Sequence, residues 1–116
     1  MYFCIAGKNK CAVDAINFLL DHKIKKNEIL ALPTNNDDGK DAWQPSLKKF
    51  AKKKGIKIAT LRKIYKIKNL FFFSLEYDKI ININKFRSKN LFNLHFSLLP
   101  KYRGCHTNFL QIFNGE

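Results

Sequence analysis

The feature that most constrains the fold of this chain is a set of short, continuous apolar runs. The first run, Tyr2 to Ala6, ends at Gly7, and a later run, Leu70 to Leu75, contains three successive phenylalanines. Runs of this length without alternation are typical of strands that are buried on both faces of a parallel sheet. The chain is therefore expected to build such a sheet, with other elements covering its faces.

Segments with helical spacing separate these runs. Apolar residues recur at three- and four-residue spacing from Cys11 to Leu20, which predicts an amphipathic helix. Pro45 to Lys54 predicts a second helix, with Ser46 near its start and Gly55 after its end. The other expected elements are strands at Glu28 to Leu32, Ile56 to Ala59 and Leu91 to Phe96, a long polar loop at Pro33 to Gly39, and a helix at Thr107 to Phe113.

The alternation of strands and helices predicts an α/β fold, with a Rossmann-like open, mostly parallel sheet and flanking helices. Binding sites of such folds lie beyond the carboxyl ends of the strands. With 116 residues the chain is one domain at most. It stops where an enzyme of this architecture would continue, so we expect the fold to be truncated at its C-terminal side.

The composition limits the function classes only weakly. The net charge of +13 favours anionic partners. However, the lysines lie in short groups along the chain, which is typical of a solvated surface, and a basic nucleic-acid-binding module stays a secondary alternative. The three cysteines show no CxxC and no metal-ligand spacing, so no metal site is indicated and a reducing cytoplasm fits best. No stretch approaches the roughly 18 apolar residues of a membrane span.

Two polar residues lie together in the expected strand Leu91 to Phe96. A period of two places Asn93 and His95 on one face, near the carboxyl end of the strand. A buried strand that presents an amide and an imidazole is costly unless a ligand or a partner supplies their hydrogen bonds. From the spacing alone, two core polar groups satisfied by the backbone explain the pattern equally well.

Residues 93–100, with the pattern Asn-x-His-x-Ser-Leu-Leu-Pro, are followed by Tyr102-Arg103-Gly104. This motif closely resembles the signature of the formyltransferases that use 10-formyltetrahydrofolate. The resemblance implies that residues 1–116 are the N-terminal portion of a formyltransferase catalytic domain. It also implies that Asn93 donates a hydrogen bond to the oxygen of the formyl group. His95 would then move the proton between the attacking amine and the departing folate.

The same resemblance implies a binding site for the folate. Its residues are Ser97, Leu98, Leu99 and Pro100 in the motif and Ser74, Leu75 and Tyr77 in the segment before it. A third catalytic residue, an aspartate, is expected well downstream of the motif, beyond the last residue of this chain. We therefore expect impaired turnover by residues 1–116 alone. No metal is implied.

The turn after the first strand is a candidate for binding the acceptor. Lys8 and Asn9 precede a helix start and are expected to bind an anionic group, although a solvated turn is the plainer interpretation. Trp43-Gln44-Pro45-Ser46 and Cys105-His106-Thr107-Asn108 resemble the sugar-modifying members of the family. The resemblance thus favours N-formyl transfer to the amine of a nucleotide-linked amino sugar, of the dTDP-amino-dideoxyhexose type.

Two alternatives remain at this point, in addition to the basic nucleic-acid-binding module. The first is a methionyl-tRNA formyltransferase, which would make initiator tRNA the nucleic-acid partner. The second is a non-catalytic Rossmann-like remnant that binds folate or nucleotide. In the favoured interpretation the partners are a small-molecule donor and an amine acceptor, without a membrane, in the cytoplasm. A homodimer is left open.

Overall fold

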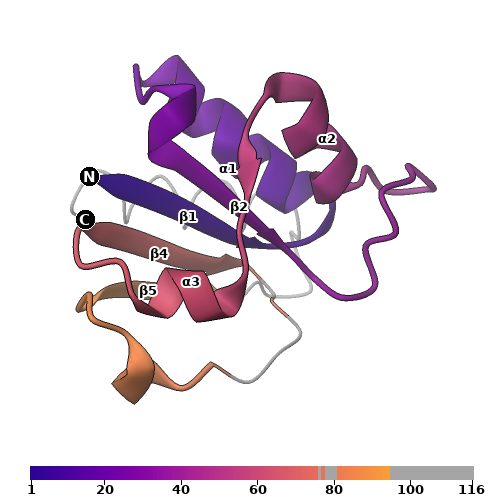
Figure 1. Ribbon diagram of the computed structural model, residues 1–116. Helices are drawn as coiled ribbons and strands as arrows, with labels where there is room; N and C mark the ends of the chain where they lie inside the picture. Colours follow the sequence, from indigo (N-terminus) through magenta and orange to yellow (C-terminus); the bar gives the residue numbers. More distant parts are fainter. Residues whose placement is uncertain (76, 78–80, 95–116) are drawn as a thin grey trace.

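The computed structural model describes residues 1–75, 77 and 81–94 of the chain. Their centre is a five-stranded parallel sheet with the strand order β3-β2-β1-β4-β5 (Figure 1). The strands are β1 (Tyr2–Gly7), β2 (Ile29–Pro33), β3 (Lys57–Ile58), β4 (Leu70–Leu75) and β5 (Asn90–Leu94). The expectation of a Rossmann-like α/β fold with a parallel sheet is confirmed.

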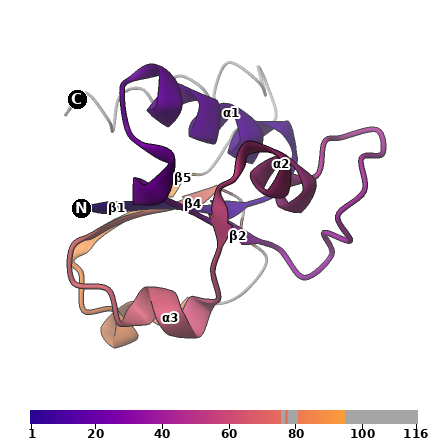
Figure 2. The same cartoon turned by 45° about the horizontal axis from the view of Figure 1, so that its top comes forward.

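Helices cover both faces of the sheet. They are α1 (Asn9–Asp21), α2 (Leu47–Lys54) and α3 (Leu61–Tyr65), with the short 3₁₀ helices η1 (Lys26–Glu28) and η2 (Ile83–Lys85). α1 and α2 lie on one face and α3 on the other (Figure 2). The chain builds from β1 to β3 in one direction and then crosses to β4 and β5. Right-handed crossovers in opposite directions place their helices on opposite faces. Within the described ranges, no helix has the length and hydropathy needed to cross a membrane.

The two faces of β1 belong to two different hydrophobic clusters. Phe3 and Ile5 pack on the side of α1 and α2, whereas Cys4 and Ala6 pack on the side of α3. Ile5 and Cys4 are both 0% exposed, so this strand is buried on both faces, as its continuous apolar run predicts. Burial of a side chain such as Ile5 stabilises the fold by roughly 1.5–3 kcal/mol.

Most predicted boundaries shift by one or two residues, for local reasons. The run Leu70–Leu75 is a strand with the predicted limits. The second strand begins at Ile29 rather than Glu28, because Glu28 ends η1 and its Oε1 accepts a hydrogen bond from the Lys25 N–H at 2.9 Å. The strand predicted at residues 56–59 is reduced to Lys57–Ile58, since the Ile56 N–H donates to the Ala51 carbonyl at the end of α2.

Capping residues determine where α2 begins and ends. α2 begins at Leu47 because Ser46 is its N-cap, with Oγ accepting from the Lys49 N–H at 3.0 Å. Gly55 ends α2 in the left-handed region at φ 75°, where glycine carries no steric penalty. α1 extends the predicted segment to Asn9 at one end and Asp21 at the other.

The structure differs more strongly from the sequence-based predictions at α3 and β5. α3 was not predicted, because it is only five residues long and only Ile64 in it is fully buried. Thr60 caps it by accepting from the Lys63 N–H at 3.4 Å. The strand predicted at residues 91–96 runs from Asn90 to Leu94 within the described residues, and residues 95–96 lie outside them. It was expected to be a buried strand, but among the described strands β5 lies at the edge of the sheet. The helix predicted at residues 107–113 also lies outside the described residues.

Candidate active site

The carboxyl ends of β1, β4 and β5 lie level with one another. Gly7 is the register partner of Leu75, and Leu75 is the partner of Leu94. The strand order reverses between β1 and β4, and this is the place where Rossmann-like sheets open a crevice for ligands. The candidate site residues divide between the two sides of this switch point.

Gly7 lets β1 and β4 approach closely at this edge. A Cβ added to Gly7 would lie 2.4 Å from the Leu75 carbonyl oxygen, closer than real Cβ contacts. A residue with a side chain would therefore push the two strand ends apart. The glycine that ends the first apolar run thus shapes the crevice as well as the turn.

Asn93 lies on β5 next to Ser74 of β4, which is its register partner. Strand alternation places it on the same face as Leu91, which packs against the cluster on the α3 side. Its side chain is exposed. In the described part of the chain β5 is the outermost strand, and Asn93 is exposed there rather than enclosed in a central strand. An exposed amide at a strand's carboxyl end is accessible to a ligand.

The segment at the end of β4 offers one aromatic surface to a ligand. Ser74 and Leu75 are 7% and 1% exposed, so both side chains are largely enclosed. Tyr77 is half-buried and packs beside the cluster on the α3 side of the sheet. Of these three side chains, that of Tyr77 is the most exposed.

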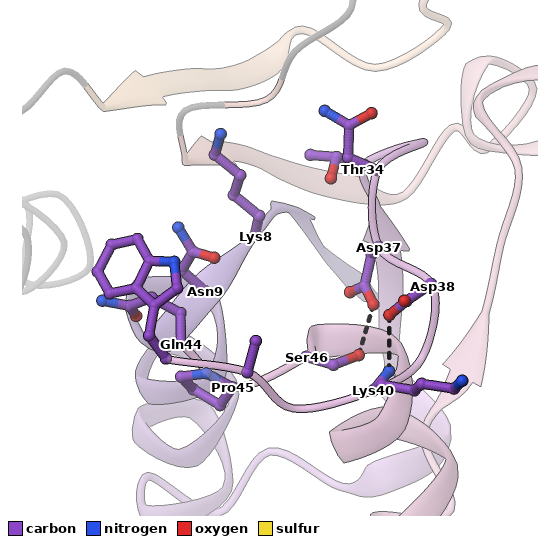
Figure 3. Close-up of a pocket in the computed structure, with 12 residues that line it drawn as sticks. Lys8, Asn9, Thr34, Asp37, Asp38, Lys40, Gln44, Pro45 and Ser46 are labelled. Carbon is purple, nitrogen blue, oxygen red and sulfur yellow. Dashed lines mark hydrogen bonds between the residues drawn. The ribbon is translucent and has the colours of Figure 1, made fainter.

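A pocket of about 370 Å³ lies on the other side of the switch point (Figure 3). It is lined by Lys8 and Asn9 after β1, by Thr34 after β2, and by much of the loop that leads to α2. Figure 3 shows Lys8 and Asn9 on one side of the pocket and Thr34 and Asp37 on the other. The two residues predicted to bind the acceptor therefore line a real cavity.

Lys8 and Asn9 form the entry to α1. Lys8 is the N-cap of the helix and makes no side-chain capping hydrogen bond, and Asn9 has a φ of 65° in the left-handed region. The backbone N–H of Lys10 donates to Oε1 of Gln44 at 3.2 Å. The Gln44 side chain thus accepts the hydrogen bond of one backbone N–H group at the start of α1. The Lys8 side chain is left as the positive group that can meet an anion here.

Asp37 holds the far wall of the pocket against the start of α2. Its Oδ1 accepts from the Ser46 hydroxyl at 2.5 Å and from the Gly39 N–H at 3.0 Å, and its Oδ2 accepts from the Lys48 N–H at 2.9 Å. Burial would raise the pKa of this carboxyl, but these hydrogen bonds outweigh burial and lower the pKa below its usual value. Asp37 is therefore ionised and engaged with the helix.

Asp41 also bonds to residues at the start of α2. Its Oδ1 accepts from the Ser46 N–H at 2.8 Å, and its Oδ2 lies 3.0 Å from Nζ of Lys49. The hydrogen bond from Ser46, followed by that from Lys49, lowers the pKa of Asp41. The sequence did not predict Asp37 or Asp41 as parts of a site, and Gln44 stood out only within the segment 43–46 that resembles the sugar-modifying members of the family. The only sequence signal of the two aspartates is a polar loop before a serine N-cap, which does not reveal their partners.

The predicted site residues thus fall into three groups. Asn93 and Ser74 are adjacent at the carboxyl ends of β4 and β5, with Leu75 and Tyr77 next in the chain. Lys8 and Asn9 lie across β1, in the pocket. The remaining candidates, His95, Ser97, Leu98, Leu99 and Pro100, lie outside the described residues. Among the residues that the structure describes, no group of three or more His, Cys, Asp or Glu side chains is placed to hold a metal ion.

Two solved structures resemble the fold and share much of its sequence. One is an N-formyltransferase from Helicobacter canadensis, solved with folinic acid and dTDP-3-aminofucose, with a TM-score of 0.81 and 45% identity over 87% of this chain. The other is WlaRD, a sugar 3N-formyltransferase solved with dTDP and 5-N-formyl-THF, with a TM-score of 0.80 and 46% identity over 100% of this chain. This chain belongs to the formyltransferase family.

Two curated formyltransferase relatives match in sequence. A methionyl-tRNA formyltransferase of Mycoplasmopsis pulmonis is 35% identical over 114 residues, which cover 84% of this chain. The bifunctional polymyxin resistance protein ArnA of Wigglesworthia glossinidia brevipalpis is 47% identical over 53 residues, or 44% of this chain. No family model matches. The chain spans 38% of the Mycoplasmopsis relative, 8% of ArnA, and 38% and 42% of the two solved chains.

Proposed function

We propose that this formyltransferase moves a formyl group from 10-formyltetrahydrofolate to the amine of a nucleotide-linked amino sugar. The observation that carries the proposal is the identity of 45% and 46% with two sugar-type N-formyltransferases, over 87% and 100% of the chain. Identity with the methionyl-tRNA enzyme is 35%. An acceptor of the dTDP-amino-dideoxyhexose type is therefore favoured over initiator tRNA.

Asn93 is proposed to stabilise the charge that develops during transfer. The acceptor amine attacks the formyl carbon, a new C–N bond forms, and the formyl oxygen becomes an oxyanion in a tetrahedral intermediate. An amide N–H aimed at this oxygen lowers the barrier, because it is in place before the charge develops. The exposed position of Asn93 at the carboxyl end of β5 supports this role.

His95 is proposed to complete the proton transfer. As the intermediate collapses, the bond from the formyl carbon to N10 of tetrahydrofolate breaks, and N10 must gain the proton that the amine loses. An imidazole suits this exchange, because its unperturbed pKa lies near neutral pH. The support is the motif, since His95 follows Asn93 by two residues in the sequence.

The folate donor is proposed to lie along the ends of β4 and β5. The half-buried ring of Tyr77, beside the apolar end of β4, suits a flat heteroaromatic group. Ser74 and Leu75 complete the wall that the structure describes. The motif residues 97–100 are proposed to supply the remainder.

The acceptor is proposed to occupy the pocket on the other side of β1. Two carboxylates in its lining, Asp37 and Asp38, already accept backbone hydrogen bonds. Lys8 and Lys40 bring two positive side chains, and Asn9 adds an amide. These groups suit the diphosphate of a nucleotide-linked sugar, and the net charge of +13 favours the approach of an anion. Donor and acceptor would then meet at the switch point between β1 and β4.

Kinetics of an Asn93→Ala variant test this assignment. With 10-formyltetrahydrofolate and a dTDP-linked amino sugar, we expect kcat to fall about 10²–10³-fold with little change in KM, because an oxyanion donor acts mainly in the transition state. The matched control is Asn90→Ala, which removes another exposed amide at the amino end of the same strand. Unchanged kcat in Asn93→Ala, or an equal loss in both variants, would contradict the proposed role.

A further inference from the structure

Trp43 is the chain's only tryptophan, and it lines the pocket while remaining 85% exposed. A single exposed aromatic side chain is common on protein surfaces and needs no explanation by itself. Two further observations distinguish this one. The loop around it is fixed by hydrogen bonds. Two lysines, Lys8 and Lys40, line the same pocket together with Asp37 and Asp38.

Hydrogen bonds hold the residues on both sides of Trp43. The Ala42 N–H donates to the Gln44 carbonyl at 3.1 Å, which closes a tight turn around Trp43. Oε1 of Gln44 accepts from the Lys10 N–H at 3.2 Å and ties this turn to the start of α1. These hydrogen bonds therefore hold Trp43 at the pocket, although its indole ring is not buried.

The lining of the pocket is otherwise mainly polar. Lys8 and Lys40 contribute positive side chains. The lining also contains two carboxylates. Asp37 accepts hydrogen bonds from the Ser46 hydroxyl and the Lys48 N–H at the start of α2, and Asp38 accepts one from the Lys40 N–H. A ligand that matches an exposed aromatic ring beside cations carries a flat π surface and an anionic group. A nucleoside diphosphate has both.

We propose that Trp43 contacts the acceptor, as a stacking platform for the base of the nucleotide-linked sugar. This inference rests on the proposed function and extends it, because it assigns the recognition of the base to one residue. Aromatic rings bind bases of every kind by stacking. Trp43 would therefore strengthen binding of the nucleotide, while other contacts would select the sugar.

The fluorescence of Trp43 reports on this contact directly. When the 116-residue chain, which contains no other tryptophan, is titrated with dTDP, we expect a saturable change in emission. Inorganic pyrophosphate serves as the probe without a base. Pyrophosphate should compete with dTDP but leave the indole emission largely unchanged. An equal change with pyrophosphate would mean that no base reaches the ring, and would overturn the proposal.

Calorimetry on two variants supplies an independent readout. Trp43→Phe keeps a flat ring and should bind dTDP within about threefold of the original chain, whereas Trp43→Leu keeps only apolar bulk and should bind about 5- to 150-fold more weakly. Both should keep the original melting temperature, since the Trp43 side chain is exposed. Tyr2→Leu is the matched control, because Tyr2 is 41% exposed at the amino end of β1.

The outcomes separate this inference from the proposed function. If dTDP binds the original chain and Trp43→Leu with equal affinity, Trp43 is not the platform, and formyl transfer to the sugar is unaffected by that result. If dTDP does not bind the original chain at all, the base-stacking role is refuted. The assay with the Asn93 variants then decides separately whether formyl transfer stands.

Discussion

Gly7 sets how closely β1 and β4 approach at the edge of the sheet where the site lies. Its position beside the Leu75 carbonyl leaves no room for a side chain. The sequence marks Gly7 only as the end of an apolar run. Its second role depends on β4, which lies more than 60 residues later in the chain. Such a contact between distant segments is not visible in local spacing.

Replacing Gly7 by alanine should destabilise the protein. The added Cβ would lie 2.4 Å from the Leu75 oxygen, so the strands must separate, and overpacking of this kind typically costs about 1–3 kcal/mol. Urea denaturation measures the loss. Gly55→Ala is the comparison, because nothing lies within 4 Å of Gly55 and the cost there comes from its φ of +75°, about 1 kcal/mol. A Gly7→Ala variant as stable as the original chain would contradict the close approach.

At the scale of elements, the loop between β2 and α2 is organised by the start of α2. Ser46 caps the helix with its own hydroxyl, and Asp37 accepts from that hydroxyl and from the Lys48 N–H. Two residues of this network, Asp37 and Ser46, line the pocket, so the same hydrogen bonds stabilise the helix and shape the cavity. The serine cap was visible in the sequence, whereas the contribution of Asp37 was not.

Asp37→Asn should weaken this element in a pH-dependent manner. The pKa of Asp37 is lowered in the fold below its ordinary value of 3.8, so its stabilising effect is fully present above that pH and is lost as the pH falls through the folded-state pKa. We expect the variant to be less stable by about 1 kcal/mol at pH 7, as for loss of a helix cap. The two proteins should converge in acid, as measured by urea denaturation from pH 7 to pH 3.

Asp38→Asn is the control for that measurement. Asp38 is exposed and its Oδ1 accepts only a local hydrogen bond from the Lys40 N–H, at 3.0 Å. Its replacement should leave the free energy of unfolding nearly unchanged. A loss for Asp37→Asn that persists undiminished at low pH would show that the ionised carboxylate is not the source of the effect.

The elements that the sequence predicts well are those with long apolar runs. The strand Leu70–Leu75 has the limits that were predicted. Every residue of that strand is buried or half-buried, so no solvent-facing position interrupts its run. α3 was not predicted because it is only five residues long, so the spacing of Leu61, Ile64 and Tyr65 covers little more than one helical turn. β5 was predicted as a strand, yet its edge position could not be read from its own residues, since it depends on which strands lie beside it.

At the scale of the whole molecule, the strand order reverses between the two groups of candidate site residues. Asn93 and Ser74 lie on one side of the switch point, and the pocket with Lys8 lies on the other. The motif at residues 93–100 indicated the family and the chemistry from the sequence. The pocket could be identified only from the structure. Its walls come from the ends of β1 and β2 and from the loop before α2, and nothing in these separate segments of sequence shows that they lie together.

The most direct test of the account is a comparison of acceptors. The protein, as expressed from its gene, is given 10-formyltetrahydrofolate with either a dTDP-linked amino sugar or initiator methionyl-tRNA, and formylated product is followed by mass spectrometry. The account predicts that the sugar nucleotide gains one formyl group and that the tRNA-bound methionine gains none. Formylation of the tRNA alone, or of neither acceptor, would contradict it.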